Sequence, residues 1–259
     1  MIIVDDVWKS FGDQQVLKGL SLTVKDNETL VILGRSGVGK SVLLKHILGL
    51  AKPDKGSIDV DQVRVSDLHG PKLYRSIKNM GMLFQGAALF DSMNIAENTA
   101  FYLRQHGDRE TGRRFTEAEI KDLVDQALDI VGLAGTQDKM PSELSGGMKK
   151  RAGLARLIVY RPDYLLYDEP TTGLDPITAM QINELIVKTK EELNATSIVV
   201  THDMISALYV GDRLALHEDG KIKYDETPEN FLTIDDPTIT FLKKTITDPY
   251  GFRSRQSGK

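Results

Sequence analysis

The spacing of hydrophobic residues along the chain alternates between two periods. Residues 29–33, 164–167 and 196–201 are short and dominated by apolar and β-branched side chains, as expected of strands buried on both faces. The apolar residues between 120 and 131, and those over 177–193, instead recur at the spacing of a helix. Strands that alternate with helices predict a parallel sheet covered by helices on both faces, which is an α/β fold.

Further strands are predicted on either side of this core. Residues 2–7 and 20–24 read as two strands joined by a polar segment, and residues 57–65 as another strand region. Residues 79–84 form a short apolar strand that ends at Gln85. Residues 214–224 read as a hairpin that turns at Glu218, Asp219 and Gly220.

The stretch between Gln85 and Pro162 is helical in character and interrupts the alternation as an insertion. Its residues 106–114 are charged and contain glycine, so an exposed loop is expected there. Thr116 with Glu119 forms a capping box for the helix that follows. We therefore expect a single domain over residues 1–245. In it, 1–85 and 162–225 form the β-rich part, 86–161 form a helical subdomain, and 226–259 supply a C-terminal helical segment and tail.

Composition narrows the classes of function. The chain has 259 residues, a formal net charge of −4 and no cysteine, so thiolate metal sites and cysteine nucleophiles are excluded. The acidic balance argues against a nucleic-acid partner bound by bulk electrostatics. The N-terminus lacks the basic start and apolar run of a signal peptide, and no apolar stretch approaches the roughly 20 residues that span a bilayer. A role at a membrane is therefore expected to need a partner.

Residues 34–41 carry a complete G-x-x-x-x-G-K-[ST] phosphate loop between the strand at 29–33 and a helix predicted over 42–48. The loop consists of Gly34, Arg35, Ser36, Gly37, Val38, Gly39, Lys40 and Ser41. Glycines allow consecutive backbone N–H groups to surround phosphate oxygens, and the helix start adds a partial positive charge. Lys40 is then expected to reach the β- and γ-phosphates, and the Ser41 hydroxyl to hold Mg²⁺.

Two adjacent carboxylates follow the buried strand at 164–167. Ligands of open α/β sheets bind at the C-terminal ends of the strands, where Asp168 and Glu169 are placed. We expect Asp168 to contribute to the Mg²⁺ site and Glu169 to polarise a water for attack on the γ-phosphate.

The segment Leu144, Ser145, Gly146, Gly147 opens a second predicted helix that could face a phosphate. Leu-Ser-Gly-Gly resembles the signature motif of the ATPase subunits of ABC transporters. This resemblance implies that Ser145, Gly146 and Gly147 bind ATP in the site of the opposite protomer of a homodimer.

Other positions resemble the same family residue by residue. Gln85 resembles the glutamine that contacts Mg²⁺ and the attacking water, and His202 the histidine that holds the γ-phosphate. Asp175, in Gly-Leu-Asp, resembles a loop residue at the dimer interface. Phe11 resembles the aromatic residue that stacks on adenine, although Trp8 lies close by and could compete for that place.

Two departures from the common family pattern point to a particular branch. Met148 stands where the family commonly has glutamine, so polar contacts from that position are in doubt. Gly-Gly-Met and the residues that follow Gln85, 86–93, resemble the Mla and Mce-type transporters, which energise phospholipid movement between Gram-negative membranes. Leu89, Phe90 and Met93 in that segment are either core residues or the lining of a docking pocket.

The resemblance implies a phosphate-loop NTPase (RecA-like) core, an antiparallel β-subdomain and an α-helical insertion. It implies a peripheral ATPase at the cytoplasmic face of the bacterial inner membrane, with ATP and Mg²⁺ as cofactors. The expected partners are a second copy, a permease that docks near residues 87–93, and an Mce-type lipid-binding protein. The alternatives are the ATPase of a solute importer and a non-transport ABC protein acting on nucleic acid or ribosomes.

Overall fold

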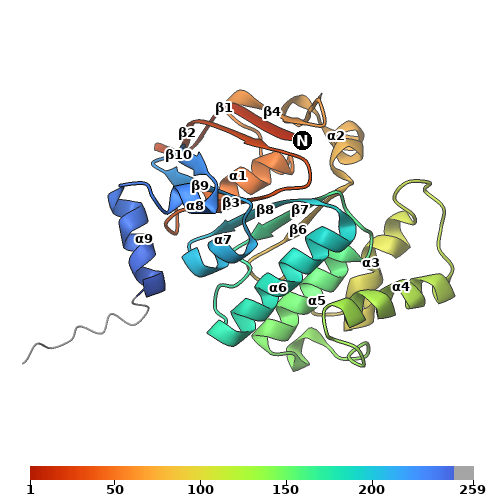
Figure 1. The fold of residues 1–259 in the computed structure, drawn as a ribbon. Helices are drawn as coiled ribbons and strands as arrows, with labels where there is room; N and C mark the ends of the chain where they lie inside the picture. Colours follow the sequence, from red (N-terminus) through yellow and green to blue (C-terminus); the bar gives the residue numbers. More distant parts are fainter. Residues whose placement is uncertain (248–259) are drawn as a thin grey trace, which may run out of the picture.

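The predicted buried strands lie side by side in one six-stranded sheet of the computed structural model, which describes residues 1–247 (Figure 1). The strands are β3 (Thr29–Leu33), β6 (Met80–Leu83), β7 (Tyr164–Asp168), β8 (Thr196–Thr201), β9 (Arg213–Glu218) and β10 (Lys221–Glu226), in the order β10-β9-β3-β8-β7-β6. All neighbours are parallel except β10, which returns antiparallel to β9 and confirms the predicted hairpin. The ends of β3, β6, β7 and β8 therefore share one edge of the sheet, where the predicted site residues follow.

The N-terminal strands form a separate antiparallel sheet in the order β2-β1-β4-β5. Its strands are β1 (Ile2–Phe11), β2 (Gln14–Val24), β4 (Lys55–Val60) and β5 (Val63–Arg64). The first hairpin is longer than predicted, because the polar segment between residues 7 and 20 is itself paired, with Trp8 opposite Lys18 and Phe11 opposite Gln14. Many side chains of that segment face solvent, which explains its polar composition.

The central strands of the six-stranded sheet are buried on both faces, and alternate residues enter different cores. Val31 and Leu33 pack with the helical side of the molecule. Leu30 and Ile32 pack with helix α1 (Lys40–Ile47) and the antiparallel sheet. The sheet thus separates two hydrophobic cores and fixes both faces around the phosphate loop.

Helices account for most of the remaining described chain. They are α2 (Gly70–Ile77), α3 (Ile95–His106), α4 (Glu117–Ile130), α5 (Gly146–Ile158), α6 (Pro176–Leu193), α7 (Met204–Val210), α8 (Pro228–Phe231) and α9 (Pro237–Thr247). Helices α3, α4 and α5 fall within the predicted insertion and gather beside β6 and α6 (Figure 1). The Thr116 and Glu119 capping box of α4 is confirmed.

The segment between β6 and α3 is an irregular loop whose backbone is hydrogen-bonded by side chains of the helices that follow, among them Asn98. Asn98 of α3 accepts from the N–H of Phe90 at 2.7 Å, and its amide donates to the carbonyls of Phe90 and Met93 at 3.1 and 2.9 Å. Ala87 and Ala88 adopt left-handed backbone angles within this loop. The helical character predicted directly after Gln85 is therefore wrong for residues 86–93, because Asn98 satisfies the loop's backbone in place of a helix.

Candidate functional site

The phosphate loop joins β3 to α1, as its sequence predicts. Gly37 and Gly39 have φ angles of 84° and 109°, a left-handed region that favours glycine. A Cβ atom on Gly39 would also lie 2.6 Å from Val16, and one on Gly34 would lie 2.7 Å from the carbonyl of His217. The glycines thus let the loop close tightly against β2 and β9 and leave the first N–H groups of α1 directed toward a ligand.

Lys40 begins α1 and is only 5% exposed. Its ammonium donates to the carbonyls of Gly34 and Arg35 at 2.7 and 3.0 Å and forms an ion pair with Glu169 at 3.1 Å. These partners hold the ammonium inside the curve of the phosphate loop. A phosphate that enters the loop would compete with Glu169 for this cation.

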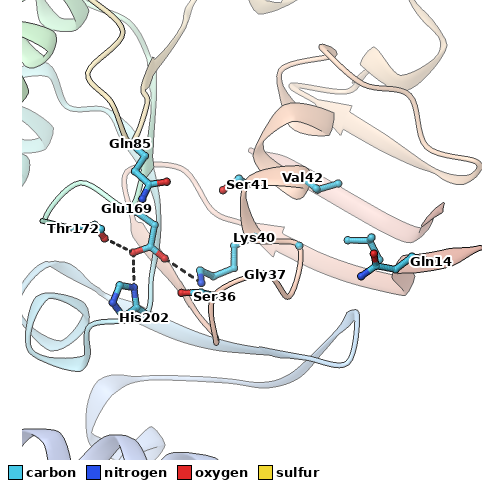
Figure 2. A pocket seen from close by; sticks show the side chains of 12 residues that line it. Gln14, Ser36, Gly37, Lys40, Ser41, Val42, Gln85, Glu169, Thr172 and His202 are labelled. Carbon is cyan, nitrogen blue, oxygen red and sulfur yellow. Dashed lines mark hydrogen bonds and ion pairs between the residues drawn. The ribbon is translucent and has the colours of Figure 1, made fainter. Parts of the chain in front are cut away.

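Glu169 lies directly after β7 with a left-handed φ of 48°, which costs a non-glycine residue about 1–3 kcal/mol. Its N–H donates to the carbonyl of Val200 at 2.9 Å, which ties the strained residue to β8. Figure 2 shows the carboxylate between Lys40 and His202. Its Oε2 atom accepts from His202 Nδ1 at 2.8 Å and from the Thr172 hydroxyl at 3.0 Å. The carboxylate is therefore held in one orientation by residues from several elements.

The predicted metal ligands lie beside this carboxylate. Ser41 Oγ donates to Asp168 Oδ1 at 2.6 Å, so the helix start and the end of β7 bring two oxygen ligands together. Gln85 follows β6 and is exposed at the same cavity. Serine, carboxylate and amide oxygens are the ligand chemistry that Mg²⁺ prefers, so the residues present fit that ion.

A cavity of about 370 Å³ lies over these residues (Figure 2). It is lined by Gln14, Val16, Ser36, Gly37, Gly39, Lys40, Ser41, Val42, Gln85, Glu169, Thr172 and His202. Of the predicted residues, Gly34 and Arg35 line a neighbouring apolar pocket instead, together with residues of α9, and Val38 and Asp168 line neither. The structure thus brings most of the predicted phosphate, metal and catalytic residues to one cavity.

Ser145, Gly146, Gly147 and Asp175 do not line that cavity. Ser145 caps α5 and accepts from the N–H of Met148 at 3.3 Å, so position 148 contributes a backbone donor whatever its side chain. A Cβ atom on Gly147 would lie 2.4 Å from Thr178. Asp175 caps α6 and accepts from Thr178 N–H at 3.0 Å, and the hydrogen bonds from Thr178 lower its pKa. The signature segment and the Asp175 loop are therefore neighbours away from this chain's phosphate loop.

The two aromatic candidates for adenine differ in their surroundings. The Trp8 indole donates to Asp6 at 3.0 Å, and its ring lies over Gly19. Phe11 is exposed at the end of β1, opposite Gln14, which lines the cavity. Phe11 itself does not line the cavity, but its position favours it over Trp8 as the stacking residue.

Two residues near the site escaped the sequence analysis. Thr172 donates to Glu169, a contact set by the turn after β7. His217 of β9 is buried against the phosphate loop, and neither ring nitrogen has a hydrogen-bond partner within the described residues. Burial, followed by the nearby Lys40 ammonium, lowers the pKa of His217 to about 4. No sequence signal identifies His217, because its contact with the loop depends on the pairing of β3 with β9.

No helix within residues 1–247 is long and apolar enough to span a membrane. Those residues also hold no cluster of three or more histidine, cysteine, aspartate or glutamate side chains able to bind a metal ion. Only Asp168 among the predicted Mg²⁺ ligands Ser41, Asp168 and Gln85 belongs to those four residue types, so this absence does not bear on the Mg²⁺ site.

Comparison with known proteins finds one family model and several ATP-binding transport proteins that are similar to this chain. The family model described as "ABC transporter" matches residues 17–172. The chain is 40% identical over 243 residues to the intermembrane phospholipid transport system ATP-binding protein MlaF of Haemophilus influenzae, covering 93% of this chain and 90% of that protein. It is 39% identical over 251 residues to the probable ribonucleotide transport ATP-binding protein mkl of Mycobacterium tuberculosis, covering 96% and 68%.

A solved structure agrees in fold. The dimeric post-hydrolysis state of the ATP-binding cassette MJ0796, bound to ADP and Pi, matches with a TM-score of 0.79 and 30% identity. The match covers 88% of this chain and 98% of that one. With Lys40, Ser41, Glu169 and His202 around one cavity, these matches show that the chain belongs to the ABC transporter family, as an ATPase subunit.

Proposed function

We propose that the chain hydrolyses ATP as a homodimer and thereby drives a separate permease that moves phospholipid between bacterial membranes. The observation that carries the lipid assignment is the 40% identity to MlaF over 90% of that protein's length. The name of the mkl relative favours a second candidate, the ATPase of a solute transporter. The two candidates share the same nucleotide chemistry and differ in the partner and in the transported molecule.

The phosphates of ATP are proposed to enter the loop and take the Lys40 ammonium from Glu169. That exchange frees Glu169 Oε1, while Thr172 and His202 keep the carboxylate in place through Oε2. Glu169 is then placed to accept a proton from the attacking water, and His202 lines the cavity where the γ-phosphate would lie. Mg²⁺, held by Ser41, Asp168 and Gln85, would offset the negative charge of the phosphates.

The signature residues support a site shared between two chains. Ser145, Gly146 and Gly147 start α5 with free access to solvent at Ser145 and Gly146, yet they lie away from the cavity of their own chain. A second copy that faces the cavity would supply this helix start to the phosphates. Asp175, beside the signature segment, would lie at the same interface.

A groove beside the loop after Gln85 supports the predicted permease dock. A cavity of about 400 Å³ is lined by Met82, Phe84, Ala88, Phe90, Phe101, Tyr102, Gly153, Arg156, Leu157 and Tyr160. Phe90 is 40% exposed, and its ring is tilted against that of Phe101 with the centroids 4.7 Å apart. The Arg156 guanidinium lies 5.5 Å from the Phe90 ring. Leu89 packs against the helical core, so the core interpretation holds for Leu89, whereas Phe90 faces the groove.

The groove is proposed to receive a cytoplasmic helix of the permease, since apolar and aromatic grooves accept helices of this kind. Docking there would place the chain peripherally on the cytoplasmic face of the inner membrane. An Mce-type lipid-binding protein is proposed as a further member of the same complex.

Native purification from membranes, with mass spectrometry of bound proteins and lipids, tests this proposal. The account predicts a permease, an Mce-type protein and phospholipid in the purified complex. A permease that brings down a soluble binding protein and no lipid would support the solute transporter instead.

A further inference from the structure

Helix α5, which begins at the signature segment, carries a buried lysine, Lys150. This lysine contacts the backbone of its own chain just after β6 and β7. Lys150 of α5 is 5% exposed, and its ammonium donates to the carbonyls of Gln85 and Glu169, the latter at 3.3 Å. Within residues 1–247 no carboxylate lies at ion-pair distance from it. Burial lowers the pKa of Lys150, while the charges of Asp168 and Glu169 raise it.

Burying a cation costs free energy of folding, and an apolar residue of the same volume would avoid that cost. Its neighbours on the same helix, such as Ala152 and Leu154, are buried and apolar. The two carbonyls that Lys150 holds therefore give the physical reason for the charge at this place.

The first carbonyl belongs to the strained residue Glu169. Its peptide N–H is fixed by Val200, and its carbonyl accepts from Thr172 N–H at 3.3 Å as well as from Lys150. The backbone on both sides of the left-handed Cα is thus tied down. Loss of the ammonium would loosen the direction in which the carboxylate points.

The second carbonyl belongs to Gln85, which follows the neighbouring strand β6. Ala87 and Ala88, two and three residues further on, are left-handed, so the chain turns sharply soon after Gln85. One ammonium therefore joins the backbone of two predicted catalytic residues that come from different strands.

We propose that Lys150 is a positioning residue that holds Gln85 and Glu169 of its own chain in their catalytic arrangement. This inference rests on the proposed function, in which Ser145 at the start of the same helix acts in the partner's site. Five residue steps separate the N-cap Ser145 from Lys150, which corresponds to about 7.5 Å along the helix axis. The signature helix would thus serve the partner's site with its first turn and its own chain's site with Lys150.

Lys150→Met, which keeps the length and removes the donors, tests the role. The expected result is a kcat at least about tenfold lower, with ATP affinity within about threefold and an unchanged or higher urea midpoint. Lys150→Arg should recover a substantial part of kcat, because it keeps donors and charge. Lys149→Met, on the same helix and without such bonds, should behave as wild type. A folded Lys150→Met protein with kcat within twofold of wild type would overturn the inference.

If Lys150→Met does not fold, Lys150→Gln decides the question, because its amide is uncharged and one bond shorter than the lysine side chain and so holds the two carbonyls less firmly. A lower kcat at retained ATP affinity supports the positioning role, and a wild-type kcat contradicts it.

Mixed dimers locate the site in which Lys150 acts. A chain with Lys150→Met should be complemented by a chain with Ser145→Arg and not by one with Lys40→Ala. The opposite pattern would mean that Lys150 acts by placing the signature segment, and it would overturn the inference. If Lys40→Ala and Ser145→Arg chains also fail to complement each other, the proposed function is wrong in having each site shared between two chains.

Discussion

The Lys40 ammonium and the Glu169 carboxylate are 3.1 Å apart, and both side chains are almost fully buried. The same carboxylate accepts from His202 and Thr172 through its other oxygen. The proposed phosphate-binding cation and the proposed base therefore form one buried ion pair, which a phosphate that enters the loop would separate. Nucleotide binding would thus break the ion pair with Lys40 and free a carboxylate oxygen of Glu169.

Glu169→Gln should keep ATP binding and lower hydrolysis at least about a hundredfold, because an amide cannot take a proton from water. The ATP-bound dimer should accumulate as a result. Steady-state hydrolysis and gel filtration with ATP measure the two effects. Turnover within a few-fold of wild type would remove Glu169 from the role of base.

Lys40→Ala should lower both ATP affinity and kcat, since it removes a buried positive charge from the phosphate loop. Lys40→Met removes the same charge but keeps most of the side-chain length, so it separates the loss of charge from the loss of packing. Equilibrium titration with a fluorescent ATP analogue measures the affinity. An unchanged affinity in both variants would place the phosphates elsewhere.

Phe90→Ala should abolish co-purification of the permease while the chain keeps its fold and its ATP affinity, because Phe90 lines the groove; Met93, the other residue predicted to dock, does not line it. Tyr209→Ala is the matched control, because Tyr209 is an exposed aromatic residue on α7 outside the groove. Pull-down from membranes, with circular dichroism of each variant, gives the answer. A folded Phe90→Ala protein that still retains the permease would move the docking site away from the groove.

His217 should make the protein less stable in acid. Its folded pKa of about 4 lies below the ordinary value of about 6.5, so between these pH values the unfolded chain binds more protons. The free energy of unfolding should therefore fall as pH decreases from 6.5, by at most about 1.4 kcal/mol per pH unit from this group. His217→Met should reduce that slope in urea unfolding at pH 7.5, 6.5 and 5.5. Equal slopes in the two proteins would rule out this contribution of His217.

Sequence patterns were sufficient to predict the features that depend on residues close together in the chain. The phosphate loop, the carboxylates after β7 and the capping box of Thr116 depend on residues a few positions apart, and the structure places them where the patterns predict. The parallel core was predictable because its strands are buried on both faces and lack a solvent-facing side.

Other features depend on pairs of residues far apart in the sequence. His217 meets the phosphate loop because β9 pairs with β3, and Asn98 organises residues 90–93 from the next helix. Helix α2 escaped prediction because it spans only eight residues and begins with Gly70 and Pro71. The contacts of Lys150 likewise require α5 to pack beside the ends of β6 and β7.

We expect each ATP site to be built from two chains. A mixture of two chains with different defects tests this expectation. Lys40→Ala and Ser145→Arg chains with different affinity tags are co-expressed, and the heterodimer is isolated through both tags. One of its sites then carries both defects and the other carries neither. The account predicts almost no hydrolysis by either homodimer and about half of the wild-type rate for the heterodimer. A verified heterodimer as inactive as the homodimers would contradict a site shared between the chains.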